Sequence, residues 1–330
     1  MAKLQLTLAC GDYDRTRALR FGLIQPEGIE LNYLCQPVEE TFWRMARSRE
    51  YDASEMSMGS YLVRRANGVE DLVAIPVFPS KYFRHGHYFV NAQAGIERPE
   101  QLKGKRMAVP EYQVTAAVWM RGILEHEYGV APRDMEWYVG GLFEPGRVEK
   151  QHISVSEGVN IHPIPEGRTL NEMIATGEVD ALMSPRAPRT FSDGSGRVRR
   201  LIPNFREVEQ DYFTRTRIFP IMHTVVIKRE ILDAHPWVAQ NLYKAFCAAK
   251  DEFVRSFEDD SALRLMLPWM VDDLEEVRRM MGDDFWSYGL GPNRHIIETL
   301  MLYEREQGLI ARELDVAGLF AHETLESYRI

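Results

Sequence analysis

The chain contains short runs in which hydrophobic and polar positions alternate, and longer runs in which hydrophobic residues recur every three or four positions. LQLTLAC, residues 4–10, and IELNYLC, residues 29–35, have the first pattern, which is typical of strands. Residues 16–21 and 39–49 have the second pattern, which is typical of helices. Because the two patterns take turns along the chain, the sequence predicts an α/β fold whose mostly parallel sheets are flanked by helices.

The order of these segments indicates two lobes. A turn-rich stretch at residues 95–99 leads into a second α/β unit, and a new strand begins after Pro220 in HTVVIKREIL. We therefore expect a discontinuous lobe I, residues 1–92 and 222–330 with a helical C-terminal region, and an inserted lobe II, residues 93–221. The carboxyl ends of the strands would line a crevice in each lobe, so a ligand cleft is expected between the lobes.

One junction between a strand and a helix stands out as a candidate ligand site. Pro110 stops the strand that ends at Val109, and helical spacing of apolar residues begins at Thr115. The first turn of a helix offers unpaired N–H groups and partial positive charge, to which Tyr112, Gln113 and Thr115 add polar side chains. The junction therefore suits an anion, although a capped helix without a ligand explains it equally well.

Other polar residues also follow predicted strands, where they could converge on the same crevice. Arg84 lies among aromatic residues at the end of a probable buried strand, which favours a carboxylate-binding role, because an unpaired buried guanidinium is costly. Arg186 either orders a loop or acts as a second anion clamp. The further candidates for substrate binding by this criterion are Arg15 and Ser184.

Three residues are candidates for proton transfer: Glu55, His85 and His223. Each has an ordinary structural alternative, since Glu55 could be a first-turn acid of a helix and either histidine could lie in the core. His85 and His87 are two positions apart, which on a strand puts them on one face and could form a divalent metal site. Structural histidines explain this HxH pair at least as well.

Composition limits the class of partner. The 330 residues carry a formal net charge of −9 and no dense Lys/Arg stripe, so nucleic acid is not an expected partner. No apolar run reaches membrane-spanning length, and the amino terminus has the pattern of a strand and not of a signal peptide. The three cysteines lack CxxC or metal-ligand spacing. We therefore expect a cytoplasmic protein with no membrane partner.

Long segments of the chain resemble one enzyme family. These segments include LACGDYDRTRAL, SEMSMGSYL, AIPVFPSKYFRHGHYFVN, LKGKRMAVPEYQVTAAVWMRGIL, EGRTLNEMIATGEVDALMSPRAP and GDDFWSYGLGPNRHIIETLMLYEREQGL. Together they resemble 4,5-dihydroxyphthalate decarboxylases over nearly the whole chain. That family in turn is similar to type II solute-binding proteins, in which two α/β lobes close over a small ligand.

The resemblance implies non-oxidative decarboxylation of 4,5-dihydroxyphthalate to protocatechuate and CO2 in phthalate catabolism. Such a reaction needs groups that hold the two carboxylates, a base near the catechol and an acid over the ring, and it requires no organic cofactor. A divalent metal bound by the catechol oxygens and by His85 and His87 is an additional possibility. A homo-oligomer is possible as well. The alternative functions are a cytoplasmic sensor that only binds an aromatic acid, or an enzyme of this fold with another substrate.

Overall fold

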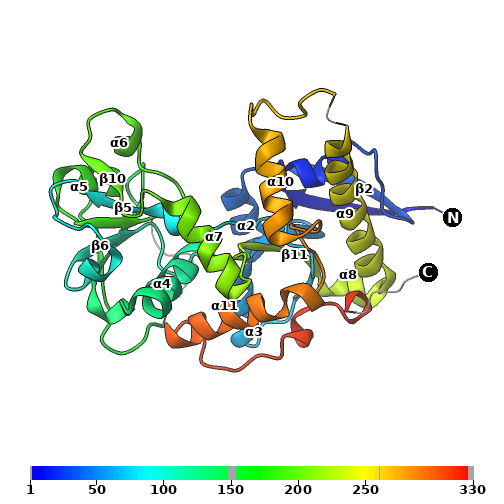
Figure 1. Ribbon diagram of the computed structural model, residues 1–330. Helices are drawn as coiled ribbons and strands as arrows, with labels where there is room; N and C mark the ends of the chain where they lie inside the picture. The colour runs from blue at the N-terminus through cyan, green and yellow to red at the C-terminus, as the bar shows by residue number, and fades with distance from the viewer. Residues whose placement is uncertain (1, 148–153, 260, 326–330) are drawn as a thin grey trace. The chain divides into compact units, whose positions relative to one another are not determined.

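The structure is a computed structural model that describes residues 2–147, 154–259 and 261–325 (Figure 1). The chain forms two compact units, each discontinuous in sequence. The first comprises Met1–Lys81, Ile221–Ile297 and Leu314–Ile330, and the second comprises Tyr82–Pro220 and Glu298–Glu313. The first crossover thus follows residue 81 and not 92, because the strand Tyr88–Asn91 pairs within the second unit's sheet.

The first unit is built on a five-stranded sheet in the order β2-β1-β3-β11-β4. β1 pairs in parallel with β2 and β3, whereas β11 runs antiparallel to β3 and β4. The sheet is therefore mixed, since the strand on which the chain returns to this unit enters in the opposite direction. The strand bounds are Leu4–Cys10 (β1), Ile29–Cys35 (β2), Ala53–Ser57 (β3), Leu72–Ile75 (β4) and His223–Lys228 (β11).

The second unit has a six-stranded sheet in the order β10-β5-β9-β6-β7-β8. β9, β6, β7 and β8 are parallel, and β5 is antiparallel to both β9 and β10. Ala108, Leu170, Ile174 and Leu182 belong to the core cluster of this sheet and its helices. The strand bounds are Tyr88–Asn91 (β5), Arg106–Val109 (β6), Glu136–Val139 (β7), Asn160–Pro163 (β8), Ala181–Met183 (β9) and Val198–Arg200 (β10).

Local sequence explains where several helices begin and end. Thr169 and Glu172 form a capping box at the start of α5, and Gly177 ends that helix with a φ of 79°, which favours glycine. The helices of the first unit are Arg17–Arg20 (α1), Val38–Ser48 (α2), Met58–Ala66 (α3), Arg229–Ala234 (α8), Trp237–Arg255 (α9) and Met270–Met281 (α10). Those of the second are Thr115–Tyr128 (α4), Leu170–Thr176 (α5), Arg189–Ser192 (α6) and Phe205–Thr216 (α7).

The helix α11, Arg294–Glu306, starts in a part of the chain that belongs to the first unit and continues in one that belongs to the second. Its later residues pack with α4, where the Trp119 and Tyr303 rings lie 5.5 Å apart. This contact explains why residues 298–313 group with the second unit, although the sequence placed them in lobe I. Among the described residues, no helix combines the length and the apolar character that a membrane span requires.

Candidate active site

Glu55 is the third of the five residues of β3 and its side chain is 0% exposed. Four donors surround its carboxylate. His223 Nδ1 lies 2.6 Å and the Tyr13 hydroxyl 2.8 Å from Oε1, while the Gly11 N–H donates to Oε2 at 2.9 Å and Cys10 Sγ lies 3.5 Å from it. Glu55 is therefore not the first-turn acid of a helix, since α3 begins three residues later.

This set of donors keeps Glu55 ionised. Burial alone would raise the pKa of Glu55, but the His223 charge and the hydrogen bonds from His223, Gly11 and Tyr13 together lower it below the ordinary value. Burial and the Glu55 charge raise the pKa of Tyr13, so its hydroxyl keeps its proton and donates. The carboxylate is thus a fixed, fully hydrogen-bonded anion.

His223 is the first residue of β11, which pairs antiparallel with β3 so that His223 lies opposite Ser57 and Val225 opposite Glu55. Its side chain is 17% exposed, and its ring meets the edge of Phe42 with centroids 4.8 Å apart. Because an ionised carboxylate can only accept, Nδ1 carries the hydrogen that points at Glu55. Nε2 is then the nitrogen available for proton exchange with a substrate.

Arg15 lies beside this pair in the same unit. Its guanidinium lies 4.3 Å from the centre of the Tyr13 ring and 4.1 Å from that of Trp286, and its Nε donates to the Pro79 carbonyl at 2.6 Å. Asp14 forms an ion pair with the same side chain at 3.1 Å. The structure therefore places the predicted Arg15 next to the Tyr13 that holds Glu55.

In the second unit, Arg84 is a buried cation that is only partly satisfied. Its side chain stacks on Tyr82 with 4.4 Å to the ring centre, and one terminal nitrogen donates to the Pro185 carbonyl at 3.3 Å. Its Nε has no hydrogen-bond partner within the described residues. Burial lowers the pKa of Arg84 to about 10, so it remains charged at neutral pH. An anion would satisfy such a group.

The structure joins Arg84 to the loop that follows β9. This loop carries the other predicted residues of the second unit, with Ser184 buried and Arg186 exposed, and the Arg186 N–H donates to Ser184 Oγ at 3.2 Å. Pro185 lies between these two residues, so the hydrogen bond from Arg84 to the Pro185 carbonyl brings Arg84 against the same loop. The guanidinium of Arg84 therefore lies against the loop that carries Ser184 and Arg186.

The junction of Val109 and Thr115 is formed as the sequence predicts, with β6 ending at the first and α4 starting at the second. Val114 precedes α4 without a side-chain capping bond, and Gln113 is buried with an Nε2 that lacks a partner within the described residues. Thr115 is buried in the first turn. Tyr112 is buried, with its ring 3.6 Å from the Arg121 guanidinium.

His85 and His87 do not lie on a strand. They form a 3-10 turn ahead of β5, so the expectation that they share one strand face is wrong. Burial lowers the pKa of His85 to about 4 and that of His87 to about 3, with added repulsion from nearby arginines. Both rings are therefore neutral at pH 7. Among the described residues, no group of three or more His, Cys, Asp or Glu side chains is placed to hold a metal ion.

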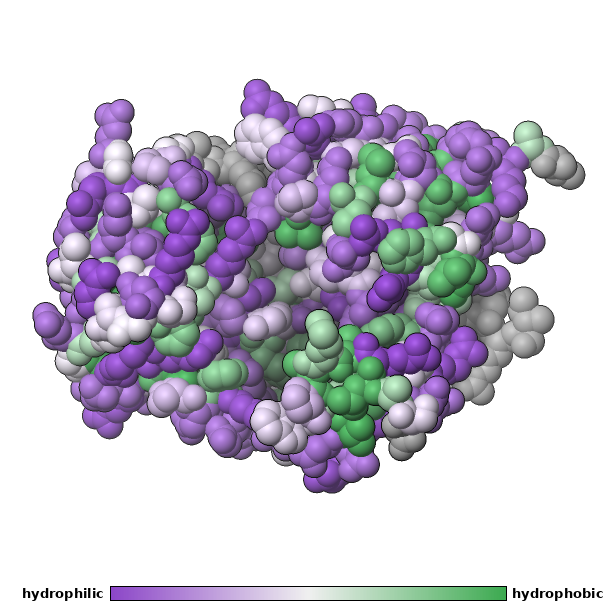
Figure 2. Space-filling view, turned by 90° about the horizontal axis from the view of Figure 1, so that it is seen from above, coloured by the Kyte–Doolittle hydropathy of each residue, from purple (hydrophilic) through white to green (hydrophobic). Residues whose placement is uncertain are grey.

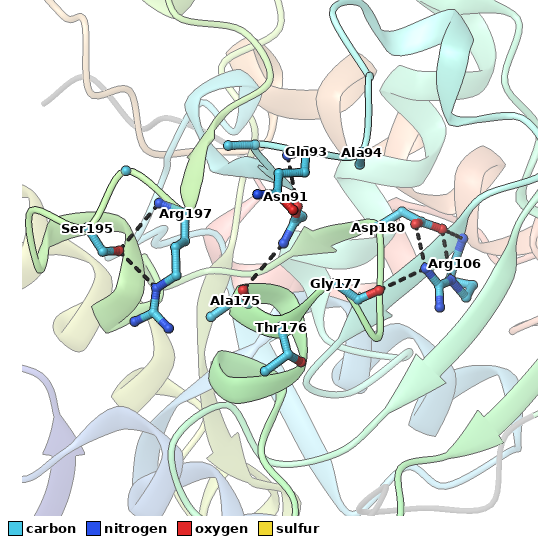
Figure 3. A pocket seen from close by; sticks show the side chains of 12 residues that line it. Asn91, Gln93, Ala94, Arg106, Ala175, Thr176, Gly177, Asp180, Ser195 and Arg197 are labelled. Carbon is cyan, nitrogen blue, oxygen red and sulfur yellow. Dashed lines mark hydrogen bonds and ion pairs between the residues drawn. The ribbon is translucent and has the colours of Figure 1, made fainter.

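A separate pocket of about 490 Å³ lies in the second unit (Figure 3). It is at the amino ends of β6 and β9, where Arg106 binds Asp180 through two hydrogen bonds of 2.7 and 3.0 Å. None of the predicted site residues lines it. Both arginines that line it have a carboxylate partner, Arg106 in Asp180 and Arg197 in Asp193, so neither is an unpaired cation that awaits an anionic substrate.

Two residues of the site, Tyr13 and Glu209, were given no role from the sequence. Tyr13 lies in GDYDR, directly after the first strand. This position at the end of a strand is the signal that could have identified it as a site residue. Glu209 lies on α7, where its carboxylate accepts the Gly86 N–H at 3.3 Å and burial raises its pKa to about 7. Nothing in the helical segment FREVEQDYF distinguishes Glu209 from the solvent-facing acids beside it.

The architecture defines a class of protein. The structure is similar to a putative periplasmic sulfonate-binding protein of Methylobacillus flagellatus, with a TM-score of 0.58 and 14% identity over 98% of this chain and 93% of that one. It is also similar to the desulfurization enzyme DSZB, with a TM-score of 0.50 and 13% identity over 98% of both chains. At such identities the likeness shows the fold alone, which is that of periplasmic binding proteins.

Sequence comparison then gives the family. The chain is 42% identical to the 4,5-dihydroxyphthalate decarboxylase of Comamonas testosteroni over 330 residues, which is all of both proteins. It is 41% identical to the protein of the same name from Pseudomonas putida over 213 residues, 64% of this chain and 83% of that one. No family model matches the chain. The protein belongs to the 4,5-dihydroxyphthalate decarboxylase family.

Proposed function

We propose that this protein is a carboxy-lyase that converts 4,5-dihydroxyphthalate and a proton to protocatechuate and CO2 in aromatic catabolism. The observation that carries this proposal is the 42% identity to a decarboxylase of that name along the whole of both chains. The substrate is then a small aromatic dicarboxylate.

The chemistry of the reaction determines which group the protein must supply. Direct loss of CO2 would leave an aryl anion, which is too unstable to form. A proton added first to the ring carbon that bears the carboxylate avoids that anion, and the hydroxyl para to this carbon supplies electron density as it loses its own proton. Cleavage of the carbon–carbon bond then returns its electron pair to the ring. The protein must therefore deliver a proton to a carbon atom.

We assign this delivery to Nε2 of His223. Nδ1 of the same ring is fixed by its 2.6 Å contact with Glu55, so the ring orientation is set before a substrate binds. Glu55 is wholly buried and its oxygens are occupied, which makes it a positioning residue that balances the charge of a protonated His223. His85, neutral with a pKa of about 4, is a poor proton carrier at neutral pH.

Arg84 is the proposed carboxylate-binding residue of the second unit, since it is a buried cation whose Nε lacks a partner within the described residues. Arg186, Ser184, Gln113 and Thr115 are further candidates for binding the substrate's anionic groups. Arg15 is the corresponding candidate in the first unit, although Asp14 already neutralises part of its charge.

A decisive experiment incubates the chelator-treated protein with 4,5-dihydroxyphthalate in heavy water. We expect protocatechuate with one deuterium at the vacated ring position and an equal amount of CO2. A protein that binds the diacid tightly and releases no CO2 would instead be a binding or sensor protein, the function suggested by the named role of its sulfonate-binding structural relative.

We also propose a cytoplasmic location. Cys10, Cys35 and Cys247 are free thiols in the structure, a state that a reducing compartment maintains. Cell fractionation with an antibody to the native protein would test this, and recovery of the protein in the exported fraction would contradict it.

A further inference from the structure

Lys81 is a buried lysine of the first unit. Hydrophilic side chains cover most of the face seen in Figure 2, as is usual for charged residues, but Lys81 is only 3% exposed. Its Nζ donates to Asn293 Oδ1 at 2.7 Å and to Ser287 Oγ at 3.2 Å. Burial lowers the pKa of Lys81 to about 7, but a neutral amine still has two N–H groups, so it can make both hydrogen bonds in either protonation state. Because the burial of a lysine is costly, these two bonds indicate what the residue does.

Both partners of Lys81 belong to the Trp286 loop, the name we give to residues 286–293 between α10 and α11 (Figure 1). Asn293 is 0% exposed and organises this loop, since its Nδ2 donates to the Ser287 carbonyl at 3.2 Å and to the Gly289 carbonyl at 2.8 Å. Lys81 binds Oδ1 of the same amide. It therefore holds the loop at the residue that organises it.

Trp286 brings this loop against Arg15. The Arg15 guanidinium lies 4.1 Å from the centre of the Trp286 ring and 4.3 Å from that of the Tyr13 ring. The Phe78 carbonyl accepts the indole N–H of Trp286 at 3.0 Å. The next carbonyl along the chain, that of Pro79, accepts Nε–H of Arg15 at 2.6 Å. An arginine that is held in this way loses little side-chain freedom when it binds an anion, which favours affinity.

We propose that Lys81 is a positioning residue for substrate binding, because it fixes the Trp286 loop so that Trp286 holds Arg15 ready for a carboxylate of the diacid. This inference rests on the proposed function, in which Arg15 is a candidate for binding the substrate in the first unit. Lys81 is itself buried and acts through the loop. Because the proton step belongs to His223, loss of the Lys81 hydrogen bonds should change KM much more than kcat.

A double-mutant cycle on Lys81 and Arg15 tests this inference. Lys81→Met has a side chain of similar length without the N–H donors. It should raise KM and the dissociation constant for 4,5-dihydroxyphthalate about tenfold, with kcat within about threefold of the parent. Arg15→Met should weaken binding at least as much. In the Arg15→Met background, Lys81→Met should weaken binding by no more than about twofold further, because its effect is carried by Arg15.

Two further variants separate this role from general support of the fold. Ser287→Ala removes one acceptor of Lys81 and should raise KM about threefold. Lys228→Met is the matched control, because Lys228 is a half-buried lysine of the same unit that pairs with Asp52 at 3.8 Å, and it should keep the parental KM and kcat. Circular dichroism should show every variant folded. If Lys81→Met does not fold, a parental KM in Ser287→Ala would overturn the inference.

The NMR signal of the Arg15 Nε–H group, identified by its loss in Arg15→Met, gives a readout that needs no substrate. The Tyr13 and Trp286 rings should shift this signal, and Lys81→Met should move it towards the position usual for arginine, while Lys228→Met leaves it in place. A parent that neither binds the diacid nor releases CO2 would contradict the proposed function, and the Arg15 signal would then decide the positioning role. Independent losses in the double-mutant cycle, a fall in kcat at constant KM, or an Arg15 signal that Lys81→Met leaves in place would each overturn the inference.

Discussion

Glu55 and His223 are 168 residues apart in the sequence and 2.6 Å apart in the structure. Each was predicted separately from its place at the end of a strand, and nothing in the local pattern shows that they touch. Their contact depends on the antiparallel pairing of β11 with β3, which is a long-range feature. For the same reason the sequence left Glu55, His85 and His223 all as candidates for proton transfer; in the structure the His85 side chain is 1% exposed and the His223 side chain 17% exposed.

Tyr13 gives a direct test of how Glu55 is held. Tyr13→Phe removes one donor to Oε1 and leaves the His223 contact in place. We expect turnover to fall by roughly tenfold, the scale of losing a hydrogen bond to a charged group, with KM nearly unchanged. Tyr51→Phe in the same unit removes a hydroxyl that bonds Gln36, away from Glu55, and should leave turnover at the parental value. Equal rates for all three proteins would remove Tyr13 from the site.

Arg84 tests the binding of the carboxylates. Arg84→Lys keeps the positive charge but loses the planar fork that can pair with a carboxylate through two hydrogen bonds, so KM should rise by roughly tenfold or more. The control is Arg189→Lys, since Arg189 is an exposed arginine of the same unit that also stacks on an aromatic ring, Phe143. Rates of CO2 release at a series of diacid concentrations give KM for both variants. If Arg84→Lys binds the diacid as tightly as the parent, Arg84 does not hold the carboxylate.

At the scale of elements, the sequence predicted what local patterning determines and missed what long-range pairing determines. β1, β2 and the junction of β6 with α4 lie where the pattern placed them. The turn at His85–His87 was predicted as strand, because the apolar run of β5 that follows it hides the boundary. The grouping of residues 298–313 with the second unit could not be predicted either, since it depends on helix–helix packing.

That packing leads to a prediction at Gly122 of α4. A methyl group there would meet the Tyr303 ring at 2.0 Å, so Gly122→Ala forces α4 and α11 apart. We expect a loss of about 1–3 kcal/mol in the free energy of unfolding, the usual cost of overpacking. Gly291→Ala is the control, because nothing lies within 4 Å of the added methyl. Chemical denaturation of both variants measures the difference, and a Gly122→Ala variant as stable as the control would contradict the packing of α11 on α4.

At the scale of the whole molecule, the ionised Glu55 should make the free energy of unfolding depend on pH in the acidic range. Its pKa is lowered by folding, so the stabilisation it provides is complete above the unfolded value of about 4.3 and is lost as the pH falls through the folded value. Glu55→Gln cannot ionise and should lose less stability than the parent as the pH falls below about 4.3. Denaturation curves at a series of pH values compare the two proteins, and parallel losses would show that Glu55 is not held as an anion.

The proton step is the centre of the proposed mechanism, and paired measurements on two histidine variants test it most directly. Diacid binding and CO2 release are measured for His223→Asn and His85→Asn, after circular dichroism has shown that both are folded. We predict that His223→Asn binds the diacid nearly as well as the parent and releases CO2 roughly 100-fold more slowly, the usual scale of general acid catalysis, while His85→Asn keeps most of its turnover. A His223→Asn variant with parental turnover would contradict the assignment of His223, and loss of turnover in His85→Asn alone would move the proton donor to the second unit.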